Sequence, residues 1–443
     1  MTAAIQGPVG SNPVVCVIVT IVVLAMGYRV SKWVAKVEGD PRFLQLLMIS
    51  LVLHLLCAPL QLWVVDHIYN GVADYTAYVN RGAALATNLR GGTFSFANTN
   101  INGFTVDNTV YIASGVVQTI VGVNKLALFI VFSGLAFLGE IAFLRAFSVT
   151  FPEVNPRRYA ILLFFLPSML FWTADVSKET IMTFALGFAA YGAALLLARR
   201  KYGYRMLIPF VAIGLLLRPN EVILFLGGLT VGMFFRSADQ RQRFRGVRRI
   251  ATLVFLGAAL AVGAYATEKL FHNQSLSSEL STVGKNNSAG SGAGYGSSNV
   301  PYSTNPLWYP RDVYTVMFDP LPFTAHGKSE LVAGLENTVL VILILGSLRQ
   351  LRCVVRACRV RPYVLLCVVY SALFMYAFAA LGNLGLIYRE RTLLLPFLLV
   401  LLSIPVTRKN LPPRFVWERP LEKRRRRRAR AAARATTGAV SYQ

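Results

Sequence analysis

Polar residues that interrupt or border long apolar segments are the first candidates for chemistry in this sequence. They are Lys178, Glu179, Arg218, Asn220, Glu221, Arg389 and Arg391. A charge placed this close to hydrocarbon is costly, so such residues are usually paired or functional. Arginine can hold a phosphate group through two parallel hydrogen bonds, and a carboxylate can accept a proton. The set therefore has the residue types needed to bind an anionic group and to move a proton beside it.

Each of these groups also has a purely structural interpretation. Arg218 and Glu221 are three residues apart and are equally consistent with an ion pair that closes a helical hairpin. For Lys178 and Glu179 a structural pair is the favoured interpretation. Arg389 and Arg391 are also consistent with anchors in the lipid headgroup layer. The sequence alone leaves these alternatives open.

The segment that begins at residue 66 supplies two candidate bases. No proline occurs from Asp74 to Arg90, so this stretch is free to form a helix, and Asp74, Tyr78 and Arg81 then share one face. We expect a short helix on the membrane surface with this polar face directed away from the lipid. Asp74 is the first candidate base, with capping of the helix N-terminus as its structural alternative. Asp66 is the second candidate, because it directly follows an apolar segment.

The elements that must position these residues are membrane-spanning helices. The chain has 443 residues, of which 55% are hydrophobic and 15% are charged, whereas soluble domains carry about 25% charged residues. Many apolar runs approach or reach the roughly 20 residues that cross a bilayer as a helix. We predict an all-α, polytopic transmembrane bundle with a juxtamembrane helix, two long outer loops and about eleven spans. The predicted spans are 13–31, 43–65, 124–146, 159–174, 180–198, 206–217, 222–235, 250–266, 333–348, 362–381 and 392–407.

The basic residues predict the orientation of this bundle. The net charge is +25, and most lysines and arginines fall in alternate loops, as the positive-inside rule requires. We therefore expect a multi-pass protein of the plasma membrane with its N-terminus outside and its C-terminus in the cytoplasm. This distribution accounts for the charge without nucleic acid as a partner. The basic run Lys423–Arg430 is expected to lie on anionic lipid.

The same pattern divides the chain into five segments. They are 1–42 (first span and cytoplasmic loop), 43–266 (transmembrane core with a first outer loop at 66–123), 267–332 (second outer loop or flap), 333–407 (C-terminal spans) and 408–443 (basic cytoplasmic tail). The second outer loop contains Trp308, Asp312 and His326. Such residues suit either sugar stacking or anchoring at the membrane interface.

Metal chemistry has no clear signature in this sequence. The five cysteines lie in or beside apolar segments, and the histidines are scattered. No metal site is therefore assigned, and the sequence leaves open whether the reaction uses a divalent metal. Inside the predicted spans, Glu140 is expected to pair with Arg145 or to extend toward the inner interface, and His54 is expected to be a core group.

Three short motifs occur in order along residues 43–405. The first is Asp74-Tyr75-x-x-Tyr78 followed by Arg90-Gly91-Gly92-Thr93-Phe94; the second runs from Phe165 to Trp172 and on to Lys178-Glu179; the third runs from Asn383-Leu384-Gly385 through Arg389-Glu390-Arg391 to Leu395-Pro396-Phe397. The first resembles the first outer loop of GT-C-type membrane glycosyltransferases, although here it follows the second predicted span and not the first. The other two resemble segments of bacterial, actinobacterial proteins of this kind.

This resemblance implies an integral membrane glycosyltransferase with its active site on the outer face. It would move a sugar from a polyprenyl-phosphate donor to a glycan or lipid acceptor of the cell envelope, with no other cofactor assigned. Asp74 would be the base and Asp66 its substitute. The arginines Arg218, Arg389 and Arg391 would hold the phosphate with help from Lys178. The remaining residues expected to line the substrate site are Tyr78, Arg81, Glu179, Asn220 and Glu221.

Two other functions remain open at this point. A polymerase or ligase of the O-antigen or exopolysaccharide type would use lipid-linked sugars but rely on arginines in place of a carboxylate base. A transporter or flippase of lipid-linked sugars would make no covalent product. Long outer loops favour the first two functions, and the lack of an internal repeat in the sequence weakens the third.

Overall fold

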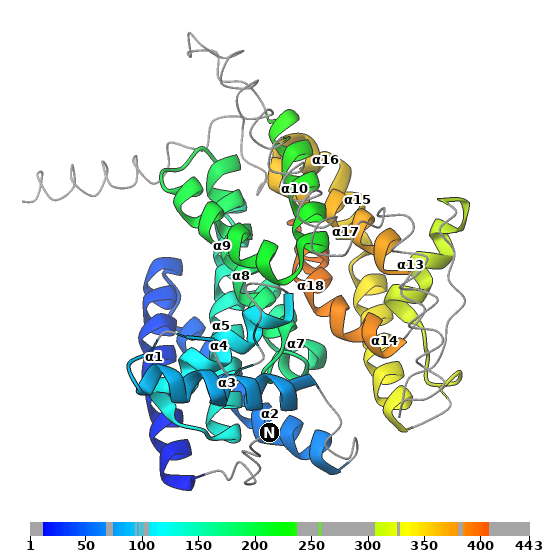
Figure 1. Cartoon of the computed structure of the whole chain (residues 1–443). Coiled ribbons are helices and arrows are strands. Elements are labelled where there is room, and N and C mark those ends of the chain that lie inside the picture. Colours follow the sequence, from blue (N-terminus) through cyan, green and yellow to red (C-terminus); the bar gives the residue numbers. More distant parts are fainter. Residues whose placement is uncertain are drawn as a thin grey trace, which may run out of the picture. The chain divides into compact units, whose positions relative to one another are not determined.

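The computed structural model describes residues 12–67, 74–93, 95–96, 99, 101, 106–236, 257, 306–325, 328–379 and 384–406. The chain divides into two units, Met1–Ile404 and Pro405–Gln443, and the described helices all lie in the first. Within the described ranges the regular elements are all helices, so the all-α prediction is confirmed there (Figure 1). The predicted span 250–266, the flap and the basic tail fall outside these ranges, apart from residue 257 and the stretches 306–325 and 328–332.

The described part of the chain contains sixteen α-helices and one short 3-10 helix. They are α1 (Pro13–Glu38), α2 (Arg42–His67), α3 (Asp74–Arg90), α4 (Val106–Val121), α5 (Lys125–Thr150), α6 (Arg157–Phe164), α7 (Pro167–Phe171), α8 (Lys178–Leu197), α9 (Gly203–Leu217), α10 (Pro219–Phe234), η1 (Pro306–Trp308), α13 (Tyr309–Phe318), α14 (Lys328–Gly346), α15 (Leu348–Arg352), α16 (Val354–Val360), α17 (Pro362–Ala379) and α18 (Leu384–Leu402).

Five of these helices are long and apolar enough to cross a membrane. They are α1, α2, α5, α8 and α17. The apolar helices α9 and α10 have 15 and 16 residues and are shorter than a full span. The chain thus has the helices of a membrane protein, but the predicted number of eleven spans is not confirmed.

Two predicted spans differ in detail from the helices that form. The stretch 159–174 is divided into α6 and α7, because Pro167 has no backbone N–H and Leu166 before it is extended, with φ −71° and ψ 126°. The last helix begins at Leu384, well before the predicted start at 392. Arg389, Glu390 and Arg391 therefore lie in the second turn of this helix and not in a loop that precedes it.

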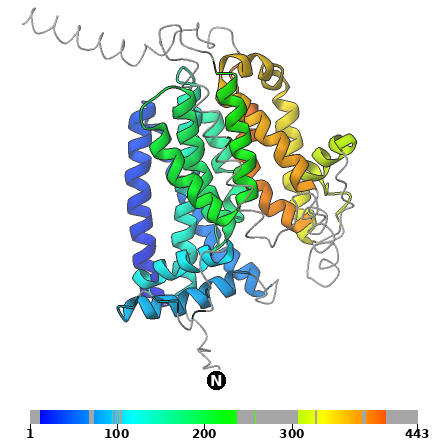
Figure 2. The same cartoon turned by 45° about the horizontal axis from the view of Figure 1, so that its top comes forward.

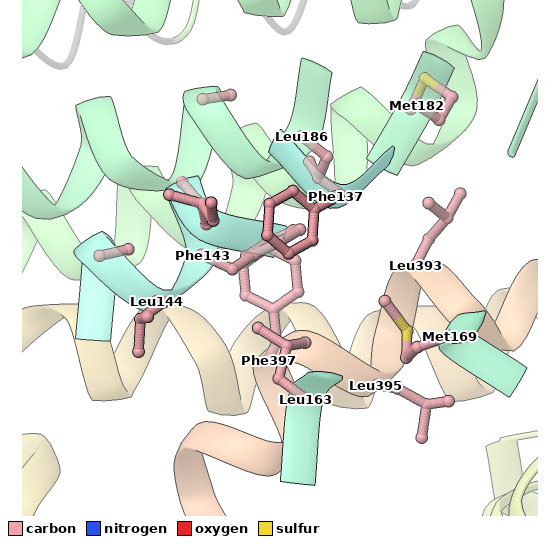
Figure 3. Close-up of a cluster of buried hydrophobic side chains, with 14 of the residues drawn as sticks. Phe137, Phe143, Leu144, Leu163, Met169, Met182, Leu186, Leu393, Leu395 and Phe397 are labelled. Carbon is pink, nitrogen blue, oxygen red and sulfur yellow. The ribbon is translucent and has the colours of Figure 1, made fainter. Parts of the chain in front are cut away.

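The centre of the bundle is the contact between α5 and α8. At Gly139 and Gly187 the two backbones approach so closely that a Cβ on Gly187 would meet the carbonyl oxygen of Gly139. Figure 3 shows the surrounding apolar cluster, in which side chains from α5 and α8 meet those of α6, α7 and α18. Phe143 and Phe397 pack edge to face there, with ring centroids 5.3 Å apart. This core fixes the ends of α8 and α18 relative to each other.

A buried polar pair also joins α2 to α5. His54 Nε2 lies 3.1 Å from Glu140 Oε1, and both side chains are fully buried. The expectation that Glu140 pairs with Arg145 is wrong, because Arg145 instead binds Glu38 at the end of α1.

Contacts between helix ends define two opposite ends of the bundle. At one of them α3 and α4 lie crosswise to the long helices (Figure 2), and the Asn124 side chain donates to the backbone oxygen of Asn12, 3.0 Å away. We call this the α3 end. At the other, the α16 end, Arg157 binds Asp40 at 2.6 Å and Arg361 binds Glu153 at 2.8 Å. The residues predicted to do chemistry gather at the α3 end.

Candidate functional site

An ion-pair network lies where α8 begins, where α9 meets α10, and in the second turn of α18. Its centre is Arg218, whose guanidinium binds Glu179 at 2.6 Å and Glu221 at 2.8 Å. The same guanidinium also binds Glu390. The three carboxylate side chains are 1%, 2% and 9% exposed in that order, so they are almost completely removed from solvent. Arg218 therefore neutralises buried charge contributed by three helices.

The local sequence explains why Arg218 points into this network. Pro219 is the first residue of α10 and forces the residue before it out of the helical conformation. Arg218 accordingly has φ −149° and ψ 79°, while its backbone N–H still closes the last turn of α9 on Gly214 O at 2.7 Å. The sharp turn places one arginine at the tip of two apolar helices. The Arg218–Glu221 pair foreseen as a hairpin closure is present, but it is one part of a larger cluster.

Arg389 connects the buried network to the surface. One of its nitrogens lies 3.0 Å from Glu179 Oε2, so Glu179 bridges two arginines. Another lies 3.5 Å from Asp74 Oδ2, at the start of α3. The Asp74 side chain is 66% exposed and that of Arg389 is 26% exposed, in contrast to the 1% of Glu179. Asp74 and Arg389 thus form the solvent-facing edge of the network.

A second ion pair holds α4 against the same end. Lys178 Nζ lies 2.5 Å from Asp107 Oδ1, and the Asp107 side chain is 55% exposed. Lys178 is therefore engaged by α4, and it is next in sequence to Glu179 of the network. Three segments that are far apart in the chain, at 74–107, 178–221 and 389–390, meet here.

Tyr78 does not lie on the exposed polar face of α3 that the sequence predicts for it. Tyr78 is 4% exposed and packs on Tyr111 of α4, with ring centroids 5.3 Å apart. It belongs to the buried stripe of α3 together with Tyr75 and Val79, and the prediction that it shares an exposed face with Asp74 is wrong. The guanidinium of Arg81 lies over the ring of Tyr111, 4.7 Å from its centroid. Arg81 holds α3 on α4 and forms no ion pair of the network. Tyr78 also packs on α4, but its hydroxyl lies beside the network: burial raises its pKa, Asp74 and Glu179 add to the rise, and Arg389 opposes it.

Three further predicted residues are not brought into the network. Asp66 accepts a hydrogen bond from the hydroxyl of Tyr75 at 2.8 Å, which joins the end of α2 to the start of α3. Asn220 is exposed, and its side chain forms no hydrogen bond within the described part of the chain. Arg391 lies on the other side of α18, because residues two apart on a helix point about 200° apart.

The surroundings of Arg391 are those of a structural residue. It is 1% exposed and donates to Met317 O at 3.1 Å and to Asn337 Oδ1 at 2.6 Å. It therefore fastens α13 and α14 to α18. A role beside Arg389 in holding a phosphate, which the sequence suggested, does not agree with this placement.

Asp175 is a candidate that the sequence interpretation missed. It lies in the short loop before α8, where Thr180 Oγ1 is 3.3 Å from its Oδ1 and 2.8 Å from its backbone oxygen. Desolvation raises the pKa of Asp175 to about 7; Arg389 opposes this rise and Glu179 adds to it. Its position three residues before Lys178-Glu179 was the signal that could have identified it. Glu390, placed between two arginines that were selected, was missed in the same way.

The network contains more acids than bases. Arg218 and Arg389 face Glu179, Glu221, Glu390 and Asp74, with Asp175 nearby. Since Arg218 is already surrounded by three carboxylates, Arg389 is the cation whose partner, Asp74, is solvent-exposed and most loosely held. The arrangement can offer an accessible carboxylate and an adjacent guanidinium to a ligand at the α3 end.

Metal ligands do not gather at this site. Across the part of the chain that the structure describes, no three histidine, cysteine, aspartate or glutamate side chains are grouped so that they could hold an ion. No protein-family model, curated protein or solved structure matches this chain.

Proposed function

We propose that this chain is an integral membrane glycosyltransferase of the GT-C type. It would transfer a sugar from a polyprenyl-phosphate donor to an acceptor of the cell envelope at the α3 end, which would face outward. The observation that supports this most is the pair formed by an exposed carboxylate, Asp74, and a partly buried guanidinium, Arg389, 3.5 Å apart at one end of a set of apolar helices.

The chemistry asks for a base and a phosphate-binding cation on the same side of the membrane. In the proposed step, an acceptor hydroxyl oxygen bonds to the anomeric carbon of the donor while the bond from that carbon to the phosphate oxygen breaks. The hydroxyl proton passes to Asp74, and the electron pair of the broken bond stays on the polyprenyl phosphate. Arg389 neutralises that phosphate through its guanidinium.

The weak contact between Asp74 and Arg389 suits this step. A donor phosphate that binds Arg389 would displace the Asp74 carboxylate, which is held at 3.5 Å and is mostly exposed. Asp74 would then be free to accept a proton from the acceptor. Donor binding and the release of the base would in this way be a single event.

The buried part of the network has a supporting role in this proposal. Glu179 binds Arg389 at 3.0 Å and Arg218 at 2.6 Å, and so fixes the direction in which the Arg389 guanidinium points. Arg218 would act through Glu179 as a positioning residue and would not touch the donor. The apolar helices around it would hold the polyprenyl tail.

Mass spectrometry of the lipids that purify with the protein in mild detergent tests the donor class. We expect a polyprenyl-phosphate monosaccharide with the wild-type protein and its loss with Arg389→Gln. Arg311→Gln, which removes an exposed arginine of α13 outside the network, is the matched control and should retain the lipid. A polyprenyl-diphosphate oligosaccharide would instead indicate a polymerase or flippase. Equal lipid content in wild type and Arg389→Gln would contradict the assignment of Arg389.

A further inference from the structure

Four arginines at the α16 end bind partners in other segments of the chain. Arg145 binds Glu38, and Arg157 binds Asp40 at 2.6 Å. Arg158 donates to Ser347 Oγ at 2.7 Å. Arg361, 8% exposed, binds Glu153 at 2.8 Å. These contacts tie α1, α5, α6 and the connections around α15 and α16 to one another, so these arginines are structural.

Four arginines on α15 and α16 have no such partner. They are Arg349, Arg352, Arg356 and Arg359, all exposed on α15 and α16. None of them forms an ion pair or hydrogen bond with a residue in the described ranges. Arg349 and Arg352 lie within about 60° of each other around α15, and Arg356 and Arg359 do so around α16. We call these four guanidinium groups the α15–α16 stripe.

One residue, Cys353, separates the two short helices, and its backbone N–H closes a tighter turn on Gln350 O at 2.9 Å. Ser347 O accepts from Leu351 N at 3.0 Å, and Cys353 O accepts from Ala357 N at 2.9 Å. Cys353, which joins the two short helices, keeps a helical conformation with φ −86° and ψ −10°. The two arginine pairs therefore follow each other on adjacent short helices, and all four side chains are exposed.

Apolar side chains flank the α15–α16 stripe. Leu348 is 46% exposed, Val355 is 65% exposed and Val360 is 47% exposed. On the opposite face, Ala357 is 1% exposed and Ser347 is fully buried against the bundle. An exposed row of cations with apolar neighbours is the pattern of a helix that lies in the membrane interface, with its cations at the level of the lipid headgroups.

The position of the two helices agrees with that depth. They join α14 to α17, and α17 is one of the five helices able to cross a membrane. They lie at the end of the bundle opposite α3 and α4 (Figure 2). A stripe attached directly to the end of a spanning helix cannot lie far from the headgroups.

We propose that the α15–α16 stripe is a binding site for anionic phospholipid headgroups. Each guanidinium offers paired N–H donors to phosphate oxygens, and the flanking apolar side chains enter the acyl boundary. An acidic protein or nucleic acid would leave Leu348, Val355 and Val360 exposed to water. The site is independent of the proposed chemistry at the α3 end.

Lipid titration of the delipidated full-length protein, followed by native mass spectrometry, tests this site. The probes are phosphatidylglycerol and phosphatidylcholine, and the test variant carries Arg349→Gln, Arg352→Gln, Arg356→Gln and Arg359→Gln. We expect the preference for phosphatidylglycerol to fall by about tenfold or more, since a basic residue near an anionic surface contributes about 1 kcal/mol. The matching quadruple arginine-to-lysine variant should retain most of the preference, which separates loss of charge from loss of fold.

A second variant at the same end removes an equal number of exposed charges. It carries Arg29→Gln, Lys32→Gln, Lys36→Gln and Lys201→Gln. We expect it to keep most of the preference for phosphatidylglycerol. An equal loss in the two glutamine variants would overturn the proposal, because it would show a general effect of net charge. An unchanged preference in the α15–α16 variant would overturn it as well.

Discussion

Among the residues of the described part of the chain, Arg218 neutralises the largest cluster of buried carboxylates. It is the partner shared by three buried carboxylates. Removing one member of a buried ion cluster leaves charges that water cannot reach, and such changes cost about 3–5 kcal/mol. Arg389, in contrast, has one buried and one exposed partner, and its buried partner Glu179 is also bound by Arg218. The two arginines should therefore differ in their effects.

We predict that Arg218→Gln lowers stability far more than Arg389→Gln. The first change should lower the melting temperature strongly and reduce activity only through loss of folded protein and a misdirected Arg389. The second should leave the melting temperature within a few degrees of wild type while abolishing donor binding. Thermal unfolding in detergent, measured beside donor binding, checks this. Equal melting temperatures for the two variants would contradict the described roles.

Asp175 predicts a dependence of stability on pH. Its pKa is raised from 3.8 to about 7, so the folded protein holds this proton more tightly than the unfolded chain does. The contribution of this carboxyl to stability is then most favourable below pH 3.8 and is lost as the pH rises to about 7. Asp175→Asn should raise the melting temperature relative to wild type at pH 8, with a difference that disappears near pH 4. A difference that stays constant across this range would argue against the buried, protonated carboxyl.

Most members of the ion-pair network could be selected from the sequence, but the partner of each could not. The cost of charge beside hydrocarbon was enough to select Lys178, Glu179, Arg218, Glu221 and Arg389. That Glu179 bridges Arg218 and Arg389 depends on how α8, α10 and α18 pack, and pairs separated by 39 and 210 positions have no local signal. Arg391 was grouped with Arg389 because the segment was interpreted as a loop before a span. Once it is a helix, neighbours two apart face different ways.

At the scale of elements, the contact between α5 and α8 determines where the first turn of α8 lies. A Cβ on Gly139 would lie 2.5 Å from the carbonyl oxygen of Thr183 and 2.7 Å from Phe184 Cα. These are backbone atoms, so they cannot move aside without separating the helices. Gly227 in α10 is different, because a Cβ there would meet only Leu373 Cδ1 at 3.5 Å.

We predict that Gly139→Ala and Gly187→Ala each lower stability by about 1–3 kcal/mol through overpacking. Gly227→Ala, the matched control, should be neutral or stabilise by up to about 1 kcal/mol, since alanine is the better helix former. Thermal unfolding of the three variants in the same detergent provides the measurement. If all three variants behave alike, helix propensity and not the α5–α8 contact determines the effect.

Hydropathy predicted the long helices well, together with the short helices α9 and α10, but it did not predict the α6–α7 break or the helix α4. The bounds expected for α1, α2, α5 and α8 agree with the structure within a few residues at their N-terminal ends. A continuous apolar segment of this length can satisfy its backbone hydrogen bonds inside a membrane as a helix, so its conformation is well determined by hydropathy. The pair α6 and α7 was predicted as one span because hydropathy ignores the break that Pro167 imposes. The helix α4 was not foreseen within the long outer loop. Its partner is α3, and packing between two surface helices leaves no hydropathy signal of spanning length.

At the scale of the whole described unit, the two ends of the bundle differ in kind. The α3 end carries a cluster in which carboxylates outnumber arginines, and the α16 end carries arginines paired with acids together with the exposed α15–α16 stripe. By the positive-inside rule the α16 end would face the cytoplasm and the α3 end the outside. This orientation is a prediction from charge.

Single cysteines test this orientation. In a background without the five native cysteines, Thr93→Cys at the α3 end and Arg352→Cys at the α16 end both place a thiol at an exposed position. We expect a membrane-impermeant maleimide to label the first in intact cells and the second only after permeabilisation. The reverse pattern would place the proposed active site in the cytoplasm and exclude an outward-facing donor site.

Asp74 is the proposed base of the sugar transfer, and one assay measures its role. Transfer from a polyprenyl-phosphate sugar to a cell-envelope acceptor fraction is measured in proteoliposomes containing wild type, Asp74→Asn or Asp66→Asn. Loss of a general base costs about 10²–10⁴ in rate, so Asp74→Asn should lose activity by that factor while still binding donor, and Asp66→Asn should keep most of it. Full activity of Asp74→Asn would exclude Asp74 as the base. A mild loss there with complete loss in Arg389→Ala would indicate the arginine-based chemistry of a polymerase or ligase.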